Sequence, residues 1–204
     1  MIAKQLEVTL GTELSIGEAE MVQRFQKLRD ARMLPVSRGR NAEDITVDAI
    51  VSGLLSIVAE RPAFAAQVVD MLRHLRPVGG STKAFAGADT LGGALVAALN
   101  DKAALDSVQE IRLSESEIYT NAPGRAAIFH RRGDEEFVTY YVSRTAVSQL
   151  RPGMEDEHDP RDLIRSIIRE TVVYSHVLQR IMLEVREDEK HARLMAGIGA
   201  ARAG

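Results

Sequence analysis

The sequence contains no cysteine and no tryptophan, and aromatic residues make up only 4% of its 204 residues. The absence of cysteine excludes disulfides, thiolate metal ligands and cysteine nucleophiles, and it fits a reducing compartment. No apolar run approaches the ~20 residues that a membrane-spanning helix needs, and the first residues lack the apolar segment of a signal peptide. We therefore expect a cytoplasmic protein with an aliphatic core and no membrane contact.

The rest of the composition is typical of a folded globular protein, with 45% apolar and 27% charged residues. A chain of 204 residues is long enough to bury a core unaided. The formal net charge of −3 gives no general attraction to a polyanion. Binding to nucleic acid would therefore require a local patch of positive charge.

The amino-terminal part of the chain has the pattern of a helical unit. Ser15 followed by Glu18 is a capping-box pattern, in which the side chain of each residue bonds the backbone of the other. This pattern predicts a helix from about Ile16 to Met33, which ends before Pro35.

Two further helices are expected before the chain changes character. Thr46 is a suitable cap for a strongly apolar helix, and Pro62 suits the first position of the next helix, which stops before Pro77. Residues 78–89 are rich in glycine and small side chains, which predicts a linker. The chain is thus expected to divide into a helical unit (1–77), this linker, and a second domain (90–204).

The second domain combines helices with strands. β-branched and aromatic residues predict a small antiparallel β-meander, with strands at 108–113, 126–131 and 136–143. A long helix is expected from about Arg161 to Glu187. The predicted fold class is therefore α+β and mainly helical, with a helical N-terminal unit, a β-meander and a long C-terminal helix.

One side of the expected C-terminal helix is apolar. A second copy of the chain could pack against it, and the residues of such a dimer seam would be Ile164, Ile167, Tyr174, Leu178 and Ile181. The alternative is that this side packs on the meander of the same chain, because the apolar repeat is short for an autonomous coiled coil.

Basic and amide side chains gather on the predicted helix 16–33 and the turn after it. From Gln23 to Arg40 there are six basic residues and one acidic residue, which gives a local charge of +5. Such a charge favours DNA binding through counterion release, and long amide and guanidinium side chains read base edges. The candidate DNA-binding residues are Gln23, Arg24, Gln26, Lys27, Arg38 and Arg40. A solvated helix face followed by a basic loop is the alternative interpretation.

The same stretch resembles the winged helix-turn-helix regulators of transcription. In that family the recognition helix ends in a Leu-Arg-x-Ala-x-x-Leu phrase before a Gly/Arg-rich wing. The phrase is present here from Leu28 to Leu34, and Arg38-Gly39-Arg40 follows it. The run from Asn41 to Thr46, before an apolar helix, is similar to small prophage-associated regulators.

The resemblance implies a fold and a mode of binding for the first quarter of the chain. It implies a helix-turn-helix unit whose helix 16–33 docks in the major groove, while a basic wing at residues 36–41 contacts the flanking backbone. Arg32 departs from the family pattern, which usually has glycine there to end the helix. The implied function is that of a sequence-specific, DNA-binding transcriptional regulator.

No catalytic or metal-binding motif is present in the sequence. The five histidines lack the His-Glu-x-x-His spacing of zinc enzymes, and the run from Gly79 to Lys83 lacks the Gly-Lys-Ser/Thr ending of a phosphate loop. We therefore expect a protein that is not an enzyme and uses no cofactor or metal. Its expected partner is double-stranded DNA. The alternative is a protein-interaction or assembly adaptor that binds a protein partner through its C-terminal part.

Overall fold

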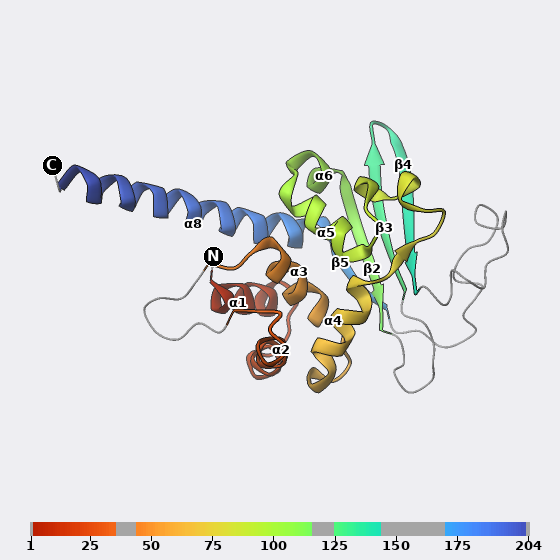
Figure 1. The fold of residues 1–204 in the computed structure, drawn as a ribbon, viewed down its shortest axis with the longest axis horizontal. Coiled ribbons are helices and arrows are strands. Elements are labelled where there is room, and N and C mark those ends of the chain that lie inside the picture. The colour runs from red at the N-terminus through yellow and green to blue at the C-terminus, as the bar shows by residue number, and fades with distance from the viewer. Residues whose placement is uncertain (1, 36–43, 116–124, 144–169, 203–204) are drawn as a thin grey trace.

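The computed structural model describes residues 2–35, 44–115, 125–143 and 170–202. These residues form helices packed against one antiparallel sheet, which confirms the predicted mainly helical α+β class (Figure 1). The α-helices are α1 (Ala3–Glu13), α2 (Glu18–Asp30), α3 (Val47–Ser56), α4 (Ala65–Arg73), α5 (Leu91–Asn100), α6 (Lys102–Ser107) and α8 (Ser175–Arg202). Short 3-10 helices are η1 (Pro62–Phe64), η2 (Ser81–Lys83) and η3 (Phe85–Gly87). No helix in these ranges is long and apolar enough to cross a membrane.

The sheet has five strands in the order β1-β4-β3-β2-β5, and each strand is antiparallel to its neighbours. The strands are β1 (Arg76–Pro77), β2 (Val108–Ser114), β3 (Arg125–Arg132), β4 (Glu135–Val142) and β5 (Glu170–Tyr174). Strands β2, β3 and β4 confirm the predicted meander. The hairpin between β3 and β4 turns at Gly133, whose φ of +61° lies in the region that glycine adopts without strain. The helices lie on one side of this sheet (Figure 1).

One hydrophobic core runs through the described parts of the chain. It extends from Leu6 and Phe25, at the amino-terminal end, to Ile128 and Ile181. The core does not divide at the expected linker 78–89. Phe85 within that segment is only 3% exposed, and its backbone N–H donates to Thr139 Oγ1 on β4 at 3.1 Å. Packing thus ties this glycine-rich segment to the sheet along part of its length.

The predicted capping box at Ser15 is wrong. Helix α2 begins at Glu18, its N-cap is Gly17, and no side chain caps it. Ser15 instead ends the preceding helix: its φ is +54°, and the next residue, Ile16, donates its N–H to the carbonyl of Gly11 at 2.9 Å. The sequence pattern was correct about a helix start nearby, but α1 needs Ser15 for its own termination.

Other local predictions are confirmed. Thr46 caps α3, since its Oγ1 accepts a hydrogen bond from the N–H of Ala49 at 3.2 Å. Thr90, for which no cap was predicted, caps α5 in the same way, with Gly93 as the donor at 3.1 Å. Pro62 occupies the first position of η1, as its fixed φ favours.

The predicted C-terminal helix is wrong in its first part. Residues 161–169 lie outside the described residues, and residues 170–174 form strand β5 rather than helix. β5 pairs with β2, from Glu110 opposite Tyr174 to Ser114 opposite Glu170. Three consecutive β-branched residues favour a strand, and the pairing buries Val173 completely. The apolar spacing that predicted a helix is therefore overridden by sheet pairing.

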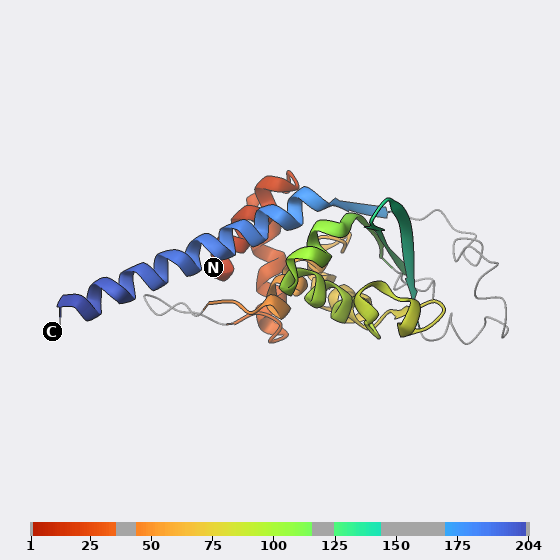
Figure 2. The ribbon, with the colours of Figure 1, turned by 90° about the horizontal axis from the view of Figure 1, so that it is seen from above.

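Helix α8 begins after β5 and has 28 residues. Its first turns pack against α1, α6 and the sheet, with Leu178 and Ile181 in the core. Two polar contacts join this root to α1: Thr9 Oγ1 donates to Glu184 Oε2 at 2.5 Å, and Arg180 Nε lies 3.9 Å from Glu13. The rest of the helix projects away from the body, as both ribbon views show (Figures 1 and 2).

Candidate functional site

Helices α1, α2 and α3 pack against one another at the amino-terminal end of the fold. Four residues, Leu14 to Gly17, separate α1 from α2, and α3 packs against both helices. Figure 1 shows α2 nearly along its axis and α1 running across the view, so the two axes cross. Two helices joined by a short turn that contains glycine are the arrangement of a helix-turn-helix motif. The described amino-terminal part thus has two consecutive helices, α1 and α2, joined by a four-residue turn.

The outward face of α2 carries three of the predicted DNA-binding residues. Gln23, Gln26 and Lys27 are exposed, and the last two lie three and four positions after Gln23, so all three share one side of the helix. Lys27 Nζ lies 3.9 Å from Asp30, and Gln26 Nε2 donates to the same carboxylate at 2.8 Å. The side chains of Lys27 and Asp30 are 48% and 53% exposed, so this is a weak surface pair that can be exchanged for another anion.

Arg24 does not belong to that face, and its prediction as a DNA-binding residue is wrong. Its side chain is 3% exposed, and Nη1 donates to the backbone carbonyl of Ser56 at 2.6 Å. Nη2 and Nε both donate to Glu20 Oε1, at 2.5 and 3.2 Å. Arg24 therefore fastens α2 to the end of α3. A sequence signal existed, because Met21 and Leu28, three positions before and four positions after it, are both core residues.

Another basic residue of α2 is also used within the fold. Arg29 Nη2 donates to Glu7 Oε2 at 3.3 Å, and Lys4 Nζ lies 2.6 Å from the other oxygen of this carboxylate. Glu7 is only 3% exposed, so the two cations compensate a buried negative charge. The hydrogen bond to Glu7 raises the pKa of Lys4 above its usual value. The local charge of +5 counted along the sequence is thus only partly available at the surface.

The basic residues Arg38 and Arg40 lie outside the described residues, as does the predicted wing at 36–41. The described chain ends at Pro35 after α2 and resumes at Asp44. Asp44 forms an antiparallel bridge with Ile2, directly before α1. The chain therefore leaves the helix pair after the second helix and returns beside the start of the first.

The predicted dimer seam is wrong for two of its residues. Leu178 and Ile181 are 1% and 0% exposed because they pack in the core of the same chain. Tyr174 is 53% exposed, but it lies on β5 rather than on a helix. Ile164 and Ile167 fall outside the described residues. The alternative, in which α8 packs on the sheet of its own chain, is confirmed.

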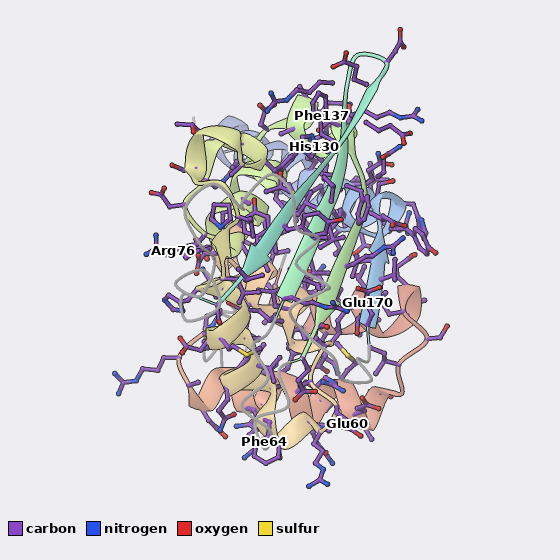
Figure 3. All side chains as sticks on the ribbon, turned by 90° about the vertical axis from the view of Figure 1, so that its right-hand side faces the viewer. Glu60, Phe64, Arg76, His130, Phe137 and Glu170 are labelled. Carbon is purple, nitrogen blue, oxygen red and sulfur yellow. The ribbon has the colours of Figure 1, made fainter. Side chains whose placement is uncertain are left out.

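The hairpin between β3 and β4 carries a second group of basic residues. Arg131 Nη2 donates to Glu136 across the strands at 2.6 Å, and this bond lowers the pKa of Glu136. His130 is buried between Phe85 and Phe137, with ring centroids 4.8 and 5.8 Å away (Figure 3). Burial, together with the charge of Arg132, lowers the pKa of His130. Arg131 is thus paired with a carboxylate on the neighbouring strand, and His130 belongs to the packing beneath the hairpin.

Within the described ranges no cluster of three histidine or carboxylate side chains is arranged to hold a metal ion. Comparison with known proteins gave no matching family model, no matching curated protein and no matching solved structure. The resemblance to winged helix-turn-helix regulators therefore stays a prediction. It depends on the residues of the phrase from Leu28 to Leu34 and on the helix pair.

Proposed function

We propose that this protein is a cytoplasmic, non-enzymatic regulator that binds double-stranded DNA through α1 and α2, with α2 in the major groove. The observation that supports this best is the pair of crossing helices with its four-residue turn, whose second helix presents an open polar face. The second helix of such a motif is the one that enters the groove. A single copy could bind in this way, and two copies would address a two-fold operator.

The residues of α2 divide into two roles in this proposal. Gln23 and Gln26 face bases, because an amide side chain can donate to and accept from adenine in the major groove. Val22, which is 41% exposed beside them, suits contact with a thymine methyl group. Lys27 contacts a phosphate, while buried Arg24 holds the helix in place.

Because Arg24 is buried, the positive charge needed for DNA affinity comes from other basic residues. Arg32 is exposed just after α2, and the sequence places Arg38 and Arg40 a few residues further on. Together with Lys27 they make four cations close in sequence. Four phosphate contacts give a log–log slope of affinity against salt of roughly −3 to −4.

A titration on duplex DNA at several salt concentrations tests this proposal. Lys27→Ala should weaken binding to all sequences and make the slope shallower by about 1, and replacing Arg38 and Arg40 together should change it by about 2. Lys102→Ala is the matched control. Lys102 also pairs with an aspartate on its own helix and is 66% exposed, but it lies on α6, at the opposite end of the body from α2 (Figure 1).

Sequence preference needs a separate measurement. Selection of binding sites from a random DNA library should yield a common site, and Gln23→Ala should relax the preference at one position. The expected loss is about 1–3 kcal/mol for the base that Gln23 contacts. Absence of duplex binding at low salt, or equal losses for Lys27→Ala and Lys102→Ala, would refute the proposal.

The second candidate function is a protein-interaction adaptor, and α8 is the feature that favours it. This helix continues well beyond its packed root (Figure 2). Helices that receive no packing are marginal in water, so a projecting helix is suited to a protein partner. Leu183, near the point where α8 leaves the body, is 47% exposed. An adaptor would show no DNA binding in the titration described above and would lose its partner when α8 is shortened after Glu187.

A further inference from the structure

Strand β5 lies at one edge of the sheet. One of its edges pairs with β2 over all five residues, and no strand in the described part of the chain pairs with the other edge. Figure 3 shows β5 at the side of the sheet, with Glu170 labelled at its start. An edge of this kind presents unpaired backbone N–H and carbonyl groups, which are a template for another strand.

Apart from the charge of Glu170 at its start, the residues of β5 offer none of the usual protection against such pairing. The strand contains no proline, glycine or lysine, and residues 171–173 are all β-branched. The opposite side of the sheet differs, since β1 has only two residues and one of them is Pro77. Proline and short length are common ways to block an edge strand. Among the described residues the two edges of the sheet are therefore not equivalent, and the edge without a partner strand is that of β5.

We infer that β5 pairs with β5 of a second copy of this chain, antiparallel and about a two-fold axis at Val172. In this register Val172 lies opposite its own counterpart, and Glu170 lies opposite the partner copy's Tyr174. No two like charges face each other, and an aliphatic pair occupies the centre, as a stable cross-strand arrangement requires. A two-fold interface needs such a self-complementary surface.

The burial of the side chains also shows on which face of the sheet formed by the two copies each residue of β5 lies. Val173 points into the core, so its neighbours Val172 and Tyr174 point to the face that the helices leave uncovered. Tyr174 is 53% exposed in the single chain and would gain contacts across the interface. Five residues of one strand bury less than the ~1,200 Å² of a standard interface, so the dimer is weak and reversible.

Disulfide cross-linking tests the register, because the chain has no cysteine of its own. Val172→Cys should form a covalent dimer under mild oxidation, since directly opposite Cβ atoms are about 4.5–5.5 Å apart. Glu170→Cys alone and Tyr174→Cys alone should not, because each would be about 13 Å from its own counterpart. A mixture of these two variants should cross-link. Val138→Cys is the control, as Val138 is exposed on β4, on the same face of the sheet.

Sedimentation of the unmodified protein without DNA completes the test. A monomer–dimer equilibrium is expected as concentration rises toward about 1 mM, the range of a contact worth about 4 kcal/mol. A monomer throughout this range would overturn the inference. So would a dimer in which Val138→Cys cross-links as well as Val172→Cys. Because no DNA is present, these results do not depend on the proposed function.

Discussion

Replacement of Arg24 by alanine tests whether this side chain stabilises the fold or binds DNA. The side chain is 3% exposed and makes a charge-assisted hydrogen bond to the carbonyl of Ser56, a bond worth about 1.5–3 kcal/mol. Its pair with Glu20 adds about 0–1 kcal/mol, since the side chain of Glu20 is 45% exposed. The stem of Arg24 is buried as well. We expect Arg24→Ala to lower the free energy of unfolding by about 2–4 kcal/mol.

Urea unfolding followed by circular dichroism measures this loss directly. For a chain of this size the same loss corresponds to a melting temperature about 4–16 °C lower. Lys27→Ala is the matched control from the same helix and should change stability by less than about 0.5 kcal/mol. Arg24→Lys keeps the positive charge but loses the two-pronged geometry, so it should still cost about 1–2 kcal/mol.

The opposite pattern would refute this role for Arg24. If Arg24→Ala left stability unchanged within about 0.5 kcal/mol but reduced DNA affinity, the side chain would be available to phosphate. Full stability and full DNA affinity in Arg24→Lys would point the same way. The structural role requires the reverse: Arg24 variants lose stability, and Lys27→Ala loses DNA affinity alone.

Three further predictions concern single residues. Arg32 follows α2 with a φ of +59°, a conformation that costs a residue with a side chain about 1–2 kcal/mol. Arg32→Gly should therefore stabilise the protein by about 0.5–1 kcal/mol. Gln23→Gly, inside the same helix, should instead destabilise it by about 1 kcal/mol. Equal effects of these two glycines in urea unfolding would contradict this explanation. The pKa of His130 is lowered in the folded chain, so the unfolded chain binds more protons and the free energy of unfolding should fall as pH drops below about 6.5. His130→Leu should flatten this pH dependence in unfolding curves measured from about pH 7 to 5. An unchanged slope in the variant would contradict this role of His130. A Cβ on Gly53 would lie 2.8 Å from Leu6 Cδ2 and 3.2 Å from Phe25 Cζ. Gly53→Ala should therefore lower the melting temperature and destabilise the protein by about 1–3 kcal/mol, despite the better helix propensity of alanine. Unchanged stability would mean that the core side chains move aside there.

Local chemistry was sufficient to predict most helices and the meander. Thr46 and Pro62 mark helix starts by themselves, because a cap or a fixed φ acts on its immediate neighbours. The three meander strands follow from their β-branched and aromatic residues. In these segments the local preference and the tertiary environment agree.

The errors arose where a distant partner decides the outcome. Residues 170–174 carry an apolar spacing that fits a helix, but β2, about sixty positions earlier, pairs with them as a strand. From its neighbours in sequence Arg24 resembles a surface cation, but in the fold it is buried and donates to the carbonyl of Ser56, 32 positions later. Helix α2 was predicted from its sequence pattern, but which of its cations are free depends on Glu7 and Glu20, and spacing alone does not show this.

The attachment of α8 to α1 has a mechanical consequence. Beyond Glu184, α8 continues for 18 residues to Arg202, which is about 27 Å, so a tilt of about 10° about its base at Glu184 displaces the far end by about 5 Å. Because Glu184 and Arg180 anchor that base to α1, the helix is a lever whose fulcrum is the first helix of the candidate DNA-binding unit. A change in the direction of α8 would therefore act first on α1, which packs against α2.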